Sequence, residues 1–167
     1  MTTADTRRIV DALSDDEVVT LICTELDRRL PGRLRGHLDA YVVALRGLPD
    51  GLRAMAATYQ LDISLTVDDL GWHFGNWQHH DYSRATADGL RTLGPPRAAE
   101  LFESAYSQAL RHWDRLSQED WMQWYHGSPL EEAVRPFDEE MRTLLGDGLV
   151  MAQWVRYARA HPDLLTE

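Results

Sequence analysis

The chain has 167 residues, with 27 acidic and 17 basic side chains and a net charge of −10 at pH 7. All 17 of those bases are arginine, and the absence of lysine excludes a phosphate-loop GK[ST] motif, Schiff-base chemistry and a pyridoxal site. The negative charge argues against direct binding of nucleic acid, which requires a basic face. The length suits one domain that buries roughly 70% of its unfolded surface without a disulfide or a structural metal.

The sequence also predicts where the protein works. The first twenty residues hold no apolar run, and no stretch approaches the ~18 apolar residues of a membrane span. The single Cys23 excludes an internal disulfide and a multi-cysteine metal site, and it lies on an apolar helical stripe that favours a core position. We therefore expect a cytoplasmic protein without a signal peptide or a membrane span.

The N-terminal part shows apolar residues at helical spacing. Ser14-Asp15-Asp16-Glu17 has the pattern of a capping box and opens a helix that Pro31-Gly32 ends. A second helix is expected over residues 34–45, and a third begins at Leu52. Residues 61–65 could pass for a short strand, but we interpret them as helix because no partner strand is visible elsewhere in the sequence.

Residues 66–94 carry two tryptophans, three histidines and the single asparagine. Thr66 and Asp69 form a further candidate capping box, which would open a short helix through Trp77. Asp81 is the expected cap of the next helix, which continues to residue 93. Charged residues on that helix are predicted to alternate along its outer face at spacings of three and four: Asp81, Arg84, Asp88 and Arg91.

Clear stop and start signals divide the C-terminal part. Gly94-Pro95-Pro96 separates two helices, and the second is predicted to run to residue 116. Ser117 with Asp120 opens a short aromatic helix, interpreted as core or interface. Ser128-Pro129 begins the next helix, and the last covers residues 149–160. The whole pattern predicts one all-α, compact domain of about eight or nine helices over residues 1–167.

Three short motifs resemble the bacterial family typified by the DNA-mimic protein DMP-nineteen. They are a Gly71-Trp72 element, the passage ATADGLRTLGPPRAAELF at residues 85–102, and a tail with PFDEE at 136–140 and WVRYARAHPD at 154–163. The first motif departs from the family pattern, because Leu70-Gly71 stands where the family has paired glycines and Trp72 replaces a phenylalanine. The resemblance covers about residues 52–164, with the helices of residues 1–50 packed on that part.

The resemblance implies an acidic homodimer that acts by binding a basic protein, without catalysis or a cofactor. The typical member is similar to DNA in surface charge and occupies the DNA-binding face of a transcription regulator. The family's interacting acids do not form a motif, so none is transferred here by position. A rival in the same class is an immunity or antitoxin-like partner of a basic toxin. A purely structural dimer is a further alternative.

The acidic excess lies in the C-terminal third, since residues 117–167 hold 10 acids and 4 arginines. The candidate partner-binding acids there are Glu119, Asp120, Glu131, Glu132, Asp138, Glu139 and Glu140. A second cluster consists of Asp15, Asp16 and Glu17. The competing interpretation is structural: Glu131 and Asp138 each stand four residues before an arginine, and acids are favoured at helix N-termini.

A metal-binding protein or small enzyme is the alternative from another class. Its candidate ligands are His73, His79, His80 and Asp81, the one metal-like cluster in the sequence. His73 and His80 would share a face if they belonged to one continuous helix. The HExxH signature is absent, and a His-His-Asp run at a helix boundary also suits capping, so the primary expectation is no metal.

Overall fold

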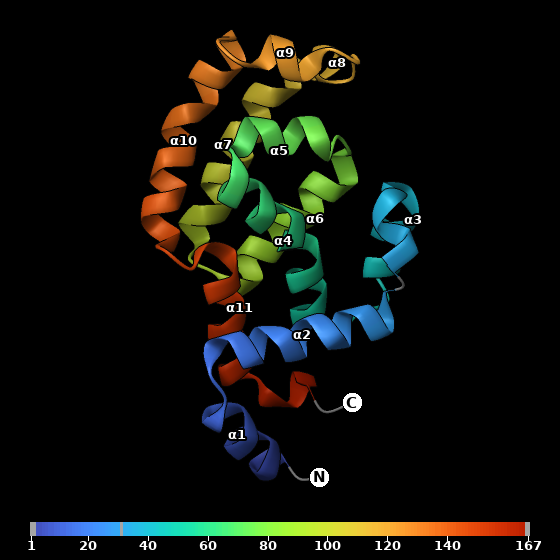
Figure 1. The fold of residues 1–167 in the computed structure, drawn as a ribbon, viewed down its shortest axis with the longest axis vertical. Helices are drawn as coiled ribbons and strands as arrows, with labels where there is room; N and C mark the ends of the chain where they lie inside the picture. The colour runs from blue at the N-terminus through green and yellow to red at the C-terminus, as the bar shows by residue number, and fades with distance from the viewer. Residues whose placement is uncertain (1–2, 31, 166–167) are drawn as a thin grey trace.

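The computed structural model describes residues 3–30 and 32–165. The described residues form eleven α-helices and two 3-10 helices and contain no strand, so the all-α prediction is confirmed (Figure 1). The helices are α1 (Thr3–Ala12), α2 (Asp15–Arg29), η1 (Gly32–Gly36), α3 (Leu38–Leu45), α4 (Asp50–Val67), α5 (Leu70–Asn76), α6 (His80–Leu93), α7 (Pro96–Leu110), α8 (Trp113–Leu116), α9 (Trp121–Tyr125), α10 (Pro129–Leu145), α11 (Leu149–Ala160) and η2 (Pro162–Leu165). None of the described helices is both long enough and apolar enough to span a membrane.

Helix α4 is the centre of the fold. It is buried on nearly every side, and α6, α11, α5, α2 and α3 all contact it (Figure 1). Small side chains let its neighbours approach closely. A Cβ atom at Gly89 of α6 would lie 2.8 Å from the carbonyl oxygen of Ala54. The hydroxyl of Thr86 on α6 donates to the carbonyl of Ala57 at 2.9 Å. One continuous hydrophobic core surrounds this crossing.

Buried polar groups of α4 connect it to α11. Trp154 Nε1 donates to the Thr58 hydroxyl at 2.9 Å. Asp62 Oδ1 accepts from the backbone N–H groups of Val150 and Met151 at 3.0 and 3.1 Å. The first N–H groups of a helix have no partner within that helix. Asp62, which belongs to α4, therefore caps the N-terminus of α11. Burial raises the pKa of Asp62, and the two N–H donors oppose that rise.

A pair of residues on α10 joins the end of α4 to the start of α5. Asp138 Oδ1 accepts from the backbone N–H of Leu70 at 3.1 Å, and its Oδ2 accepts from Arg142 Nε at 2.6 Å. The other guanidinium nitrogens of Arg142 donate to the carbonyls of Leu65 and Asp68. One i, i+4 pair thus caps the C-terminus of one helix and the N-terminus of the next.

Helix α9 packs on a glycine face of α5. A Cβ atom at Gly71 would clash with Tyr125, and one at Gly75 would clash with Trp121. The Tyr125 hydroxyl donates to both carboxylate oxygens of Asp69, at 2.7 and 2.8 Å. These two rings of the predicted aromatic cluster are therefore packed against the domain, as the core interpretation expected.

Several predicted element boundaries are confirmed. Ser14 and Glu17 form the expected capping box at the start of α2. Ser128 accepts from the backbone N–H of Glu131 and caps α10, with Pro129 at the first helical position. Residues 61–65 are helical and lie inside α4. These signals are local, and the atoms that satisfy them lie within four residues along the chain.

Other predicted boundaries are wrong. Thr66 lies inside α4, and Asp69 alone caps α5 by accepting from Trp72 N–H. The cap of α6 is His79 and not Asp81. The helix expected to run to residue 116 ends at residue 110, and α8 follows as a separate turn. The helix expected over residues 34–45 is divided into η1 and the shorter α3.

Candidate protein-binding surface

The predicted acids of the C-terminal third come from α10 and from the connection between α8 and α9. Figure 1 places α8, α9 and the start of α10 at one end of the molecule, with α10 continuing along an outer edge. The buried face of α10 includes Leu130, Val134 and Met141. Its exposed face presents Glu132 and Glu139 to solvent. The helical period thus directs some of the predicted acids outward and holds others inward.

Three of these acids have no internal partner. Within the described residues, no ion pair or side-chain hydrogen bond involves the carboxylates of Glu119, Glu132 and Glu139, and all three residues are exposed. Glu132 and Glu139 are seven residues apart on one helix, which corresponds to a rise of about 10.5 Å. Three steps along one strand of B-DNA, at about 3.4 Å each, cover nearly the same distance.

Two further acids on this surface are held by arginines from neighbouring elements. The carboxylate of Asp120 accepts hydrogen bonds from both terminal nitrogens of Arg115, at 2.5 and 2.8 Å. Glu140 accepts from Arg97 at 2.8 and 3.1 Å. These hydrogen bonds lower the pKa of Asp120 and of Glu140. Both carboxylates remain ionised near neutral pH, but their charge is largely balanced by a fixed guanidinium.

Glu131 and Asp138 have structural roles. Glu131 accepts from the backbone N–H of Gly127 and lies 3.6 Å from Arg135. Asp138 was expected on the surface, but only 7% of it is exposed and its carboxylate is occupied by Leu70 and Arg142. Burial raises the pKa of Asp138, and Arg142 opposes that rise. Asp138 is therefore removed from the candidate surface.

The N-terminal cluster is also largely structural. Asp15 pairs with Arg159 of α11 at 2.7 Å, and the same guanidinium donates to two backbone carbonyls of residues 10–13. Glu17 accepts from the backbone N–H of Ser14, which lowers the pKa of Glu17. Asp16 is exposed and its carboxylate has no partner among the described residues. One of the three acids is thus available to a binding partner.

The histidines do not form the alternative metal site. His73 lies in α5, only 1% of it is exposed, and its Nδ1 is 3.0 Å from the Ser64 hydroxyl. Burial lowers the pKa of His73 to about 3. His80 opens α6, so the two histidines do not share one helix as the spacing argument required. Among the described residues, no three His, Cys, Asp or Glu side chains form a group that could hold a metal ion.

His79, His80 and Asp81 each have a separate partner. His79 Nδ1 accepts from a backbone N–H of α6, so its Nε2 carries the proton and donates to Asp39 of α3 at 2.8 Å. His80 Nδ1 lies 2.6 Å from the Tyr106 hydroxyl. Asp81 pairs with the arginine one turn further along α6, at 2.9 Å. The segment therefore fixes how α3, α6 and α7 meet.

Residues 46–161, from the end of α3 through α11, match the DMP19-like protein family. The chain belongs to the DMP19-like protein family. No curated protein and no solved structure matches the chain significantly. The resemblance expected from the short motifs is thus confirmed, with both ends of the matched region slightly earlier than residues 52–164. Helices α1, α2, η1 and α3 all precede the matched region.

The motifs that carried the resemblance are structural in this DMP19-like protein. Gly71 makes room for Tyr125, and Asp138 of the PFDEE motif caps α5. In the final motif, the rings of Tyr157 and His161 pack against each other at a tilt of 32°, with centroids 4.3 Å apart. The motifs therefore identify the fold. Of the exposed acids without an internal partner, Glu139 lies in the PFDEE motif, whereas Glu119 and Glu132 lie outside all three motifs.

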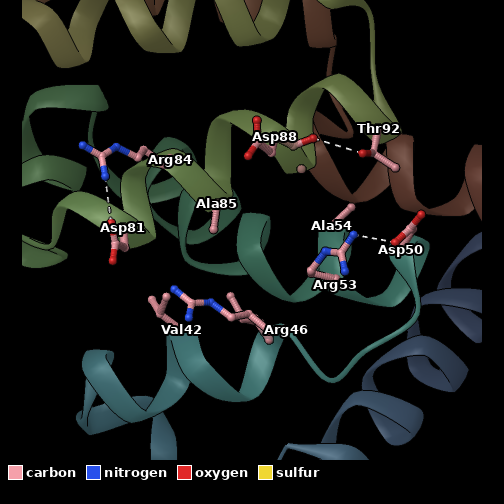
Figure 2. A pocket seen from close by; sticks show the side chains of 12 residues that line it. Val42, Arg46, Asp50, Arg53, Ala54, Asp81, Arg84, Ala85, Asp88 and Thr92 are labelled. Atoms are coloured by element: carbon pink, nitrogen blue, oxygen red, sulfur yellow. Dashed lines mark hydrogen bonds and ion pairs between the residues drawn. The ribbon is translucent and has the colours of Figure 1, made fainter.

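The DMP19-like fold also contains a groove that the sequence did not predict. It lies between α3 and α6, residues of α4 also line it, and its volume is about 480 Å³ (Figure 2). Three arginines line it: Arg46 directly after α3, Arg53 on α4 and Arg84 on α6. The alternating charges of α6 were predicted to face outward, as they do. Three of them, Asp81, Arg84 and Asp88, line the groove. The helical pattern of α6 did not predict this, because the groove depends on where α3 packs.

Proposed function

We propose that this DMP19-like protein is a non-enzymatic DNA mimic that binds the DNA-binding face of a basic transcription regulator. Family membership and the net charge of −10 support the proposal. The observation that carries it is the outer face of α10, where the unpaired Glu132 and Glu139 are separated along the helix axis by about the rise of three nucleotide steps of one DNA strand. Glu119 would extend this face at the α8–α9 end.

Electrostatic complementarity gives such a surface both attraction and selectivity. A protein that binds DNA presents arginines and lysines to the phosphates, and those side chains would meet carboxylates here. The carboxylates stand on a helix fixed by its packing against α7, so the backbone that carries them is ordered before the partner arrives. The proposal requires no cofactor. It places the protein in the cytoplasm, where bacterial DNA-binding regulators act.

The proposal includes a homodimer, since regulators commonly bind paired half-sites about one helical turn apart. Ile63 and Val67 are the candidate contact, because these exposed apolar side chains lie one turn apart on α4 and Val67 is 63% exposed. Sedimentation velocity over a range of protein concentrations tests this part. A single species with the mass of one chain at all concentrations would contradict it.

Capture from a lysate of the organism that encodes the chain tests the function. The immobilised protein is loaded at low salt, eluted with a salt gradient, and the eluted proteins are identified. We expect a basic DNA-binding protein that elutes steeply with salt and that its own DNA site displaces, because both ligands would occupy one surface. A captured protein that DNA does not displace contradicts mimicry. If the captured protein is a basic toxin, the immunity interpretation replaces DNA mimicry.

A further inference from the structure

The groove between α3 and α6 has the size and the mixed lining of a small-molecule site. Its volume of about 480 Å³ lies in the range of roughly 300–1,000 Å³ that is typical of ligand pockets. Leu45, Ala54 and Ala85 give it an apolar part, and charged side chains line it from α3, α4 and α6. No part of it overlaps the outer face of α10.

Most charges around this groove are already paired. Asp81 lies 2.9 Å from Arg84, and Asp88 lies 2.8 Å from Arg91. The third aspartate of the lining, on the first turn of α4, pairs with Arg53 at 2.5 Å. Each of the three aspartates therefore already has an arginine partner. None of them is left to balance a further arginine in the groove.

Arg46 differs from its neighbours. It follows α3 as the C-cap residue, and within the described residues its side chain has no ion pair or hydrogen bond. Figure 2 shows its guanidinium extending into the space between α3 and α6, toward the side of the groove that holds Ala85. An unmatched cation beside an apolar surface is suited to an anion with an apolar body. The planar guanidinium matches the geometry of carboxylates and phosphates in particular.

We infer that the α3–α6 groove binds a small organic anion. Its carboxylate or phosphate would accept hydrogen bonds from Arg46, and its apolar body would contact Ala85 and the small part of Leu45 and Ala54 that reaches the groove. The groove is separate from the proposed partner-binding face. The outcome of its test is therefore independent of DNA mimicry.

The test is titration of the isotope-labelled protein, followed by ¹⁵N–¹H NMR. The probes are phenyl phosphate and benzoate, which share an aromatic ring and differ in the anionic group. Inorganic phosphate is the anion without an apolar body, and benzyl alcohol is the ring without a charge. We expect saturable shifts at backbone amides lining the groove, such as those of Ala54, Ala85 and Gly89, with at least one of the two aromatic anions. Inorganic phosphate and benzyl alcohol should bind at least about tenfold more weakly.

Three variants locate the binding. Arg46→Gln should weaken the better anion by at least about tenfold, because it removes a charge-assisted hydrogen bond. Arg111→Gln is the matched control, since it removes one exposed positive charge that does not line the groove. Ala85→Leu should also weaken binding, because the larger side chain enters the groove while Arg46 is kept.

Several results would overturn the inference. One is the absence of saturable shifts at the groove with both aromatic anions. Another is an equal loss of affinity in Arg46→Gln and Arg111→Gln, which would indicate a general charge effect. Binding of inorganic phosphate as tight as that of phenyl phosphate would remove the role assigned to the apolar lining. Unchanged affinity in Ala85→Leu would place the bound anion outside the groove.

Discussion

Individual buried polar residues determine much of this structure. Asp62, His73 and Asp138 are each less than a tenth exposed, and each contacts a different element of the core. A buried polar group without a partner costs free energy, so the contacts of Asp62, of Asp138 and of His73 Nδ1 favour this arrangement, whereas His73 Nε2 is buried without a hydrogen-bond partner among the described residues. The pKa of His73 shows the strength of that burial, since it is lowered from 6.5 to about 3.

His73 should make stability depend on pH. The unfolded chain protonates this residue near pH 6.5, whereas the folded chain does so only near pH 3. The free energy of unfolding should therefore fall as the pH drops below about 6.5, by as much as roughly 1.4 kcal/mol per pH unit from this residue. Replacing His73 by glutamine removes the titration and keeps a polar group beside Ser64.

Urea denaturation at pH 7 and pH 5 measures the effect. Between these values the wild type should lose about 2 kcal/mol more than His73→Gln. Asp62 and Asp138 are present in both proteins, so their raised pKa values cancel in the difference. His37→Gln, at an exposed position, should behave like the wild type. Equal losses in the wild type and His73→Gln would show that His73 is protonated as readily in the folded state as in the unfolded one.

The sequence predicts the role of a capping residue when its hydrogen-bond partner lies only a few residues away along the chain. Ser14 and Ser128 were assigned correctly because each cap bonds a residue three positions away. Asp138 was misplaced on the surface because the N–H that it accepts comes from a residue 68 positions away. Asp62 received no role for the same reason, since its partner is 88 positions away. Charge and spacing alone do not reveal such long-range caps.

At the scale of whole helices, α10 acts through its two faces. Its inner face carries the Asp138–Arg142 pair, which fixes the turn between α4 and α5. Its outer face carries Glu132 and Glu139. The same spacing of three and four residues that predicted the helix also separates these faces. The apolar stripe of Val134, Met141 and Leu145 indicated the buried face, but it did not show that Asp138 lies in that face, because the groups that bond the Asp138–Arg142 pair come from α4 and α5.

Removal of Arg142 should therefore destabilise the fold. Arg142→Met leaves the buried carboxylate of Asp138 without its cation, so we expect a loss of about 2 kcal/mol in the free energy of unfolding. Adding Asp138→Asn should recover part of that loss, because the amide is neutral and its oxygen can still accept from Leu70. Chemical denaturation of the wild type, of both single variants and of the double variant measures these changes.

The same helix supplies the control. Arg135→Met breaks an exposed pair with Glu131, in which the closest nitrogen and oxygen are 3.6 Å apart. It should cost less than about 1 kcal/mol. If the double variant lost as much as the sum of its two single changes, Asp138 and Arg142 would act independently. The account of a shared clamp would then be wrong.

Across the whole molecule, fewer acidic side chains are unpaired than the net charge alone suggested. The acidic excess of the C-terminal third was visible in the sequence. Arg97, Arg115 and Arg159, however, come from α7, α8 and α11 and pair with predicted acids outside their own helices, which are Glu140, Asp120 and Asp15. The structure therefore reduces the ten predicted acids to the four exposed ones without partners, which are Asp16, Glu119, Glu132 and Glu139.

The measurement that tests the central proposal most directly is the affinity of the captured regulator for a Glu132→Gln, Glu139→Gln double variant. The control is Asp11→Asn with Asp163→Asn, which removes the same charge from exposed positions on α1 and η2. Fluorescence anisotropy of the regulator's labelled DNA, titrated with each protein at several salt concentrations, gives the affinities.

We expect the α10 variant to displace DNA at least about tenfold less effectively, with a shallower dependence on salt. Its thermal stability should match that of the wild type, because neither glutamate makes an ion pair in the described structure. The control should bind almost as the wild type does. Equal displacement by the α10 variant and the wild type would show that the outer face of α10 is not the DNA-mimicking surface.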